Sequence, residues 1–236
     1  MNELAQMAQS VLGIQLTQAS LNAMGVFEAE LLDWNERVNL TAIQEPGKVR
    51  VKHFLDSLTC LLAMRNTRMD RVIDVGTGAG FPGLPLKILF PTMQLTLLDS
   101  VGKKTEFCHH MVQVLGLRGV EVIQERAEVL GQNPKYREMY DWAITRAVAS
   151  MPVLAEYQLP LVRIGGSMLA MKGETAPAEV QTAENALRLM GGHLRRLIRL
   201  TLPGVADERY LVVVDKQHTT PPKYPRRPGV PAKHPL

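Results

Sequence analysis

The stretch DVGTGAGFPG, which begins at Asp74, is the part of the sequence whose residue types and spacing most directly indicate chemistry. Glycines this dense shape a loop around a ligand, and the stretch has two registers. Gly76, Gly78 and Gly80 form GxGxG directly after the apolar run RVIDV. A second register, GxGxxG, ends at Gly83 and is the pattern of dinucleotide-binding loops, which should begin right after the strand. Here it begins late, so the first register is favoured.

Two carboxylates distinguish the ligands that such a loop could bind. Asp74 stands just before the glycines, where it would repel a pyrophosphate and attract a cationic amino group. Asp99 ends the next apolar run, LTLLD, where an acid can accept hydrogen bonds from both ribose hydroxyls. S-adenosylmethionine carries an ammonium group, a ribose and no phosphate. We therefore predict a class I methyltransferase that binds this cofactor through Asp74, the three glycines and Asp99. The alternative is a glycine turn between strand and helix that has no ligand.

The acceptor of the methyl group is less well indicated. The sequence has no NPPY-type motif for exocyclic amines and no Pro-Cys nucleophile for pyrimidine carbon, and Cys108 lies inside an expected helix. Guanine N7 is compatible with these absences, because its lone pair is nucleophilic and no proton must leave first. Such an enzyme can work by proximity and orientation, so we assign no catalytic base.

The elements that would position these residues follow from apolar periodicity. The first sixty-odd residues are helix-like, with Thr17 as an N-cap and a second helix expected over 49–64. From Arg71 onward, short β-branched runs alternate with helical stretches, which indicates a mostly parallel sheet. HLRRLIRLTLP and RYLVVVDKQ are separated only by GVADE and predict an antiparallel edge hairpin. The expected fold is α/β and Rossmann-like, seven-stranded, with an N-terminal helical cap.

Composition and charge place limits on the protein class. The chain has 236 residues, 46% of them hydrophobic and 21% charged, which is ordinary for a globular protein. Its two cysteines have no paired spacing, which argues against disulfides or a thiolate metal site and fits a reducing compartment. No leader and no membrane-spanning run is visible, so we expect a cytoplasmic protein, with a monomer as the simplest state.

The positive charge is concentrated at the end of the chain. Residues 216–236 contain five of the Lys and Arg residues, no Asp or Glu, and six prolines from Pro221 onward. We predict three units, a helical extension (1–65), a methyltransferase domain (66–216) and a basic proline-rich tail (217–236). Tyr224 could stack on RNA bases and Arg226 and Arg227 could contact phosphate or guanine. Removal of the tail should then weaken RNA binding more than cofactor binding.

Nine segments together resemble a known family over nearly the whole chain. They are WNERVNLTA, HFLDS, DVGTGAGFPG, LLDSVGKK, ERAE, TRAVA, MKG, ERYLVVVDK and YPRRPGVPAKHPL. The sequence resembles the RsmG family, also called glucose-inhibited division protein B. Most of the motifs are weak alone, whereas HFLDS before the glycine loop together with the C-terminal ending is specific. Ala79 stands where the family often has proline, which leaves the loop intact.

The resemblance implies a methyltransferase that modifies guanine N7 in the decoding-region loop of 16S ribosomal RNA, either as naked RNA or in an assembling small subunit. It implies cofactor contacts from Gly76 and Phe81, and an adenine bracketed by Ala127 and Glu128. Arg146 would lie at the end of the fourth strand and face both cofactor and acceptor. Substrate contacts are expected from His53, Asp56, Arg146, Lys172, Arg226 and Arg227.

Each of these assignments has a competing interpretation. Glu128 could be a surface acid, Arg146 could pair with Asp141 or Glu128, and His53 and Asp56 could be an ion pair on one helix face. For the whole protein, the alternatives are a methyltransferase for another RNA, a protein or a small molecule, and a nicotinamide-dependent oxidoreductase. An RNA-binding protein with a cofactor-free version of the fold is disfavoured by the intact glycine loop.

Overall fold

The computed structural model describes all 236 residues and is built around a single seven-stranded sheet. The strand order is β3-β2-β1-β4-β5-β7-β6, and the first five strands run parallel. β7 is antiparallel to both β5 and β6, which confirms the expected edge hairpin. The strands are β1 (Arg71–Val75), β2 (Gln94–Asp99), β3 (Val120–Gln124), β4 (Tyr140–Arg146), β5 (Val162–Lys172), β6 (Gly192–Leu200) and β7 (Arg209–Lys216).

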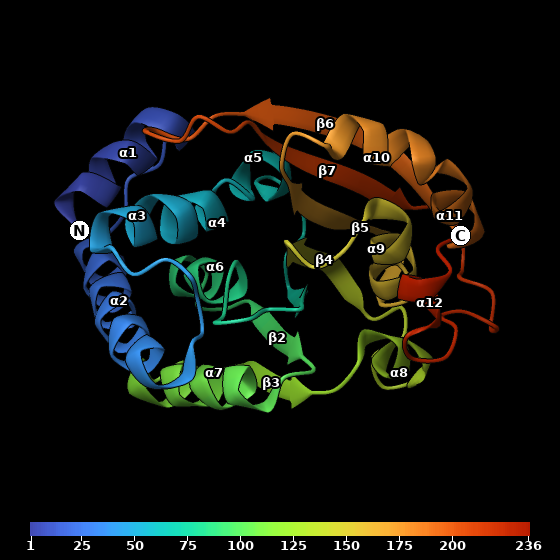
Figure 1. Cartoon of the computed structure of the whole chain (residues 1–236), viewed down its shortest axis with the longest axis horizontal. Helices are drawn as coiled ribbons and strands as arrows, with labels where there is room; N and C mark the ends of the chain where they lie inside the picture. Colours follow the sequence, from blue (N-terminus) through green and yellow to red (C-terminus); the bar gives the residue numbers. More distant parts are fainter.

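Helices cover both faces of this sheet (Figure 1). The N-terminal cap consists of α1 (Asn2–Leu12), α2 (Gln18–Val38), α3 (Pro46–Val49), the π-helical η1 (Arg50–Leu55), α4 (Asp56–Leu58) and α5 (Leu61–Met64). It packs on the same face as α6 (Gly83–Leu89) and α7 (Gly102–Val114). The opposite face carries α8 (Ala127–Gln132), α9 (Met151–Gln158), α10 (Ala176–Thr182), α11 (Glu184–Leu189) and the short α12 (Val230–Lys233).

Strand residues feed these two hydrophobic cores in alternation. Val72 and Trp142 enter the core under the cap, whereas their neighbours Ile73 and Ala143 enter the core under α9. This alternation follows from the two-residue period of a strand, and it explains why the strands are continuous apolar runs. The expected strands and the alternating helices are therefore confirmed.

The helix expected over 49–64 is divided in the structure. α3, η1 and α4 follow one another directly, and a turn at Thr59 and Cys60 separates them from α5. The hydroxyl groups of Ser57 and Thr59 donate to the backbone oxygens of His53 and Asp56. Such side-chain bonds compete with regular helix bonds. Lys52 and His53 belong to the π-helical segment η1, and both line a cavity.

Helix α2 begins as the sequence predicts. The Thr17 hydroxyl accepts from the Ser20 backbone N–H, so Thr17 is the N-cap. At the far end, Asn39 adopts a left-handed backbone with φ 49°, and the chain continues into the loop of Leu40 and Thr41. The buried Asn35 amide holds this loop by accepting from the N–H groups of both residues.

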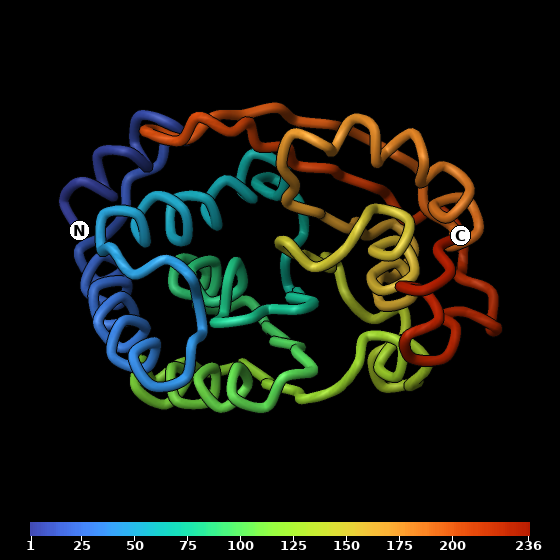
Figure 2. Tube along the Cα trace, viewed as in Figure 1, coloured from blue at the N-terminus to red at the C-terminus, as the bar shows by residue number.

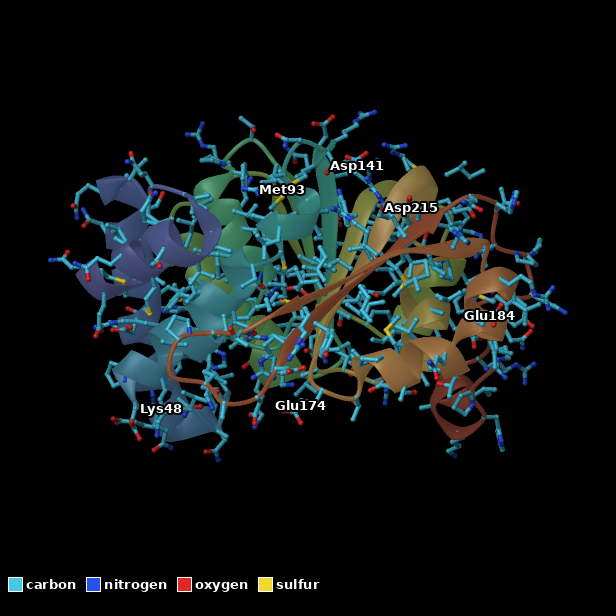
Figure 3. All side chains as sticks on the ribbon, turned by 90° about the horizontal axis from the view of Figure 1, so that it is seen from above. Lys48, Met93, Asp141, Glu174, Glu184 and Asp215 are labelled. Carbon is cyan, nitrogen blue, oxygen red and sulfur yellow. The ribbon has the colours of Figure 1, made fainter.

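The two ends of the sheet lie at opposite edges of the molecule. Figure 3 shows Asp141, at the start of β4, and Glu174, just past the end of β5, on opposite sides. The strand order reverses between β1 and β4, so the carboxyl ends of these strands form the position where doubly wound sheets bind ligands.

Candidate active site

A cavity of about 710 Å³ opens at the carboxyl ends of β1, β2, β4 and β5. The cap closes one side of it through Leu40, Thr41 and η1, and α8 and α9 close another. Ten of the residues expected at a site line this cavity: His53, Asp56, Gly76, Gly78, Phe81, Asp99, Ala127, Glu128, Arg146 and Lys172. Asp74, Gly80, Arg226 and Arg227 do not.

The glycine loop has a left-handed backbone at three of its glycines. Gly76, Gly78 and Gly80 have φ of 71°, 60° and 90°, which L-residues with side chains rarely adopt. A Cβ at Gly76 would lie 2.4 Å from a Val148 methyl carbon, whereas a Cβ at Gly78 would meet no protein atom within 4 Å. Gly78 thus leaves open space on the cavity wall, into which a ligand can approach the backbone.

Asp99 joins the loop to the end of β2. One carboxylate oxygen accepts from the Gly78 N–H at 2.9 Å and the other from the Val101 N–H at 2.9 Å. Each carboxylate oxygen can accept a further bond. The residue lines the cavity, so it is placed where the sequence predicts a ribose contact.

Asp74 is placed differently from our expectation. It is fully buried beneath the loop and does not line the cavity. Its Oδ2 accepts from the Thr77 hydroxyl at 2.7 Å and from the Gly83 N–H at 2.8 Å, while Oδ1 has no partner. Burial raises the pKa of this carboxyl to about 7. The expectation of a direct contact with a ligand's amino group is corrected, because this carboxylate holds the loop from below. Gly80 likewise packs inward, against Leu84.

A second cluster lies across the cavity, around Arg146 at the end of β4. Its guanidinium donates to Asp56 Oδ2 and to His53 Nδ1, both at 3.0 Å, and lies 5.3 Å from the centre of the Phe81 ring. The expected pairing of His53 with Asp56 is therefore mediated by Arg146. Arg146 pairs with neither Asp141 nor Glu128. Asp141 pairs with Arg163, and Glu128 accepts from the Gly229 N–H.

These contacts determine the protonation of His53. Arg146 is only a donor, so Nδ1 of His53 must accept, and the proton lies on Nε2, which donates to the Thr41 hydroxyl at 2.8 Å. Burial and the neighbouring Arg146 cation lower the pKa of His53 to about 3. The ring stacks on Phe81, with centroids 4.7 Å apart. His53 is a neutral residue with both nitrogens engaged, which makes it a poor general base.

Glu128, at the first turn of α8, is 2% exposed and lines the cavity beside Ala127. Burial excludes the interpretation of Glu128 as a surface acid. Tyr157 of α9 lines the same wall, and burial together with the charge of Glu128 raises its pKa. Lys172, at the end of β5, also lines the cavity, but it is held by Glu179 at 2.7 Å and by the Ala149 carbonyl.

The C-terminal residues expected to contact RNA are placed away from the cavity. Arg226 is bound to the buried Glu156 through Nε and Nη2, and Tyr224 is 7% exposed. Neither side chain is free to stack on a base or bind a phosphate, so this part of the prediction is wrong. The local reason is that α9 carries a buried carboxylate that requires a cationic partner. Arg227 is exposed.

Sequence reasoning missed several cavity residues. Lys52, Arg126 and Arg209 line the cavity without any carboxylate within ion-pair distance, and Arg209 Nε is buried without a partner. Thr41, Arg126 and Arg209 stand within the segments NLTA, ERAE and ERYL, so the matched motifs contained the signal. The motifs do not show that these residues line one cavity, because they lie far apart in the sequence and only the fold brings them together.

Both cysteines are buried, and neither is placed as a nucleophile. Cys108 lies beneath the glycine loop, with its thiol 3.5 Å from the Gly78 carbonyl. Burial raises the pKa of both thiols, which disfavours the reactive thiolate. Cys108 packs, as the sequence indicates.

The cavity fits S-adenosylmethionine in its chemistry. The open position at Gly78 admits a ligand to the loop backbone, and the Asp99 carboxylate retains acceptor capacity at the end of β2. No Lys or Arg stands within the glycine loop to bind a pyrophosphate. Doubly wound topology, an antiparallel β7 and this site define a class I S-adenosylmethionine-dependent methyltransferase.

Comparison with known proteins identifies the family. The model of the family described as rRNA small subunit methyltransferase G matches residues 20–202. A ribosomal RNA small subunit methyltransferase G from Dehalococcoides mccartyi is 48% identical over the full length of both chains. The protein of the same name from Alkaliphilus metalliredigens is 45% identical and covers 95% of this chain and 94% of its own. The chain belongs to the rRNA small subunit methyltransferase G family, and it is an rRNA methyltransferase.

Solved structures agree on the fold. TrmN from Thermus thermophilus has a TM-score of 0.52 at 19% identity, over 68% of this chain and 48% of its own. Geranyl diphosphate C-methyltransferase from Streptomyces coelicolor has a TM-score of 0.54 at 10% identity, over 69% and 78%. The [4+2]-cyclase SpnF also matches, with a TM-score of 0.53. Because a cyclase shares the fold, function has to be argued from the site.

Proposed function

We propose that this protein transfers a methyl group from S-adenosylmethionine to N7 of a guanine in the decoding-region loop of 16S ribosomal RNA. The named relatives support an acceptor in small-subunit RNA, and the geometry of the site supports guanine N7 as the accepting atom. The observation that carries the proposal is the absence of a free general base on the acceptor side of the cavity. His53 has both ring nitrogens engaged, and Asp56 is paired with Arg146.

Guanine N7 is an acceptor that such a site can serve. Its lone pair attacks the methyl group directly, and no proton has to leave before the bond forms. When bound, the cofactor supplies a methyl group on a positively charged sulfur. The protein therefore has to hold the two reactants in line and exclude water, which is catalysis by proximity and orientation.

The cavity residues have separate proposed roles. Gly76, Gly78 and Phe81 shape the surface for the cofactor, and Asp99 accepts hydrogen bonds from its ribose. Ala127 and Glu128 flank the adenine. Arg146, fixed by Asp56 and His53, faces both cofactor and acceptor, and Lys172 lines the acceptor side.

The unpaired cations at the cavity support an RNA substrate. Lys52, Arg126 and Arg209 come from three separate segments of the chain and have no carboxylate partner. By contrast, Arg50, Arg163 and Arg226 are all paired. Phosphate contacts position a nucleic acid, and free Lys and Arg supply them. We assign these three residues to the RNA backbone around the target guanine.

We also propose the organisation and setting of the protein. Residues 1–65 form a helical extension on a methyltransferase domain of residues 66–216, and residues 217–236 form a C-terminal tail that packs on that domain. The protein works as a monomer in the cytoplasm. Two buried free cysteines are consistent with a reducing compartment. No helix of the structure is long and apolar enough to span a membrane.

A methyl-transfer assay with labelled S-adenosylmethionine tests this proposal. The substrates are naked small-subunit RNA and partly assembled subunits, with the wild-type protein beside Gly78→Asp. Label in RNA that is lost in the variant supports the proposal. Cofactor binding without transfer to either substrate would overturn the acceptor. Binding of a nicotinamide dinucleotide in place of S-adenosylmethionine would overturn the cofactor and favour an oxidoreductase.

A further inference from the structure

The last twenty residues, 217–236, form an ordered strap against α8 and α9. Figures 1 and 2 show this red segment beside both helices, at the opposite end of the molecule from the N-terminus. Side chains of the methyltransferase domain hold its backbone. Arg137 donates to the carbonyls of Thr220 and Tyr224, and Gln132 donates to the carbonyl of Pro225. The strap is therefore part of the folded domain surface.

Two buried carboxylates receive hydrogen bonds from the strap. Glu156 of α9 is 0% exposed and is bound by Arg226 through the backbone N–H and the guanidinium, at 2.6–3.1 Å. Glu128 of α8 is 2% exposed, and its Oε1 accepts from the backbone N–H of Gly229 at 2.8 Å. Buried carboxylates are stable only when bound in this way.

The contact with Glu128 lies at the wall of the cavity, and the contact with Glu156 lies on the helix that supplies another residue of that wall. Glu128 itself lines the cavity, and Tyr157, the neighbour of Glu156, lines it too. The strap also packs closely on α8, since a Cβ at Gly131 would lie 2.8 Å from a Pro225 ring carbon. The strap thus fixes α8 and α9 from outside at the wall where Ala127 and Glu128 stand.

We propose that the strap is a positioning element of the cofactor pocket, with Gly229 acting through Glu128 and Arg226 acting through Glu156. The proposal rests on the assignment of the adenine to Ala127 and Glu128. Its consequence reverses our expectation from the sequence. Loss of strap contacts should weaken cofactor binding more than RNA binding.

Gly229 permits a specific test, because it has φ 82° and a Cβ there would meet no atom within 4 Å. Gly229→Val adds no clash but cannot hold this backbone, so the N–H should leave Glu128. Gly229→Asn tolerates the left-handed conformation and should keep the bond. Gly13→Val is the matched control, since Gly13 has φ 66° and equally open surroundings at the end of α1.

We expect Gly229→Val to raise the Kd for S-adenosylmethionine about tenfold, because a hydrogen bond to a charged group is lost. Gly229→Asn and Gly13→Val should stay within about twofold of the wild type, as should the affinity of Gly229→Val for small-subunit RNA without cofactor. Unchanged cofactor affinity in Gly229→Val, or an equal loss of RNA affinity, would overturn the proposal.

Two further measurements separate this role from general stabilisation. In a Glu128→Ala background, Gly229→Val should cause no additional loss of cofactor affinity, because the bond it breaks is already absent. A full additional loss would contradict action through Glu128. A chain that ends at Pro228 removes the N–H outright and places a terminal carboxylate near Glu128, so it should lose at least as much cofactor affinity as Gly229→Val. If the wild-type protein itself does not bind S-adenosylmethionine, the proposed function fails instead.

Discussion

His53 is held in a single tautomer by Arg146 on one side and Thr41 on the other. The sequence motif HFLDS indicates that His53 and Asp56 belong together, but it cannot show that a residue of β4 lies between them. That arrangement depends on a parallel sheet bringing the end of β4 against η1. The motif therefore predicts which residues matter, and only the structure shows that the histidine is neutral and engaged.

The pH dependence of stability tests the state of His53. Its pKa is about 3 in the folded protein and 6.5 as an unperturbed group, so between these values the unfolded chain binds one more proton. The free energy of unfolding then falls as pH falls through this window, with a slope of up to about 1.4 kcal/mol per pH unit. His53→Gln should lose this contribution, which urea unfolding between about pH 4.5 and 7.5 would show.

The raised pKa of Asp74 changes the free energy of unfolding with pH in the opposite direction, but it does not affect the comparison of the wild type with His53→Gln. Its raised pKa gives the folded protein an extra proton, so its contribution to stability falls as pH rises from 3.8 towards 7. This contribution is common to the wild type and His53→Gln and cancels in their difference. Identical slopes for the two proteins would show that the pKa of His53 is not lowered in the folded protein and would contradict its assignment as a residue that stays neutral at mildly acidic pH.

At the scale of elements, the glycine loop was the most predictable part of the site. Its glycines predict a ligand-binding loop directly after β1, and the structure has such a loop there, with positive φ at Gly76, Gly78 and Gly80. Less predictable was the placement of Asp74, because a residue that follows a strand can face the ligand or the core. Hydrogen bonds from Thr77 and Gly83 hold its side chain in the core.

Gly78→Ala tests whether the open position in this loop admits the cofactor. We expect a loss of about 1 kcal/mol in the free energy of unfolding, from the left-handed backbone alone. The added methyl group takes cavity space, so the Kd for S-adenosylmethionine should rise at least about tenfold. Calorimetry and thermal unfolding measure the two effects.

Gly116→Ala is the matched control for this loop variant. Gly116 ends the turn after α7 with φ 58° and open surroundings, so the backbone cost is the same. Cofactor affinity should be unchanged, because Gly116 lies outside the cavity. Equal affinity losses in both variants would mean that Gly78 acts only through stability.

At the scale of the whole molecule, the cap and the sheet share one hydrophobic core. Phe27 of α2 stacks on Phe81 of the glycine loop, with ring centroids 4.8 Å apart, and Phe81 in turn stacks on His53. The helical extension could be predicted from its periodicity. Its register on the sheet could not, because that depends on long-range packing of buried side chains.

Phe27→Leu tests the connection between the cap and the site. The substitution keeps an apolar side chain but removes the stacked ring, so we expect a loss of about 1 kcal/mol in stability. The Kd for the cofactor should rise about threefold or more, because Phe81 loses its support. Val26→Ala, at a position 41% exposed on the same helix, is the control and should change neither quantity. Wild-type cofactor affinity in Phe27→Leu would show that the cap does not influence the loop.

The C-terminal strap shows where composition misleads. Prolines, arginines and a tyrosine without acidic residues are typical of an RNA-binding tail, and the sequence alone favours that interpretation. The structure instead uses Arg226 to neutralise Glu156 and buries Tyr224. A partner buried 70 positions away in the chain cannot be identified from local pattern.

The most direct test of the account is the position of the transferred methyl group. Small-subunit RNA would be incubated with the protein and S-adenosylmethionine, cut by a base-specific nuclease, and its fragments analysed by mass spectrometry. We predict one added methyl group, on N7 of a guanine in the decoding-region loop. A methyl group on another base, on an exocyclic nitrogen or on ribose would contradict the proposal. An exocyclic nitrogen or a ribose hydroxyl has to lose a proton, and neither His53 nor Asp56 is free to accept it.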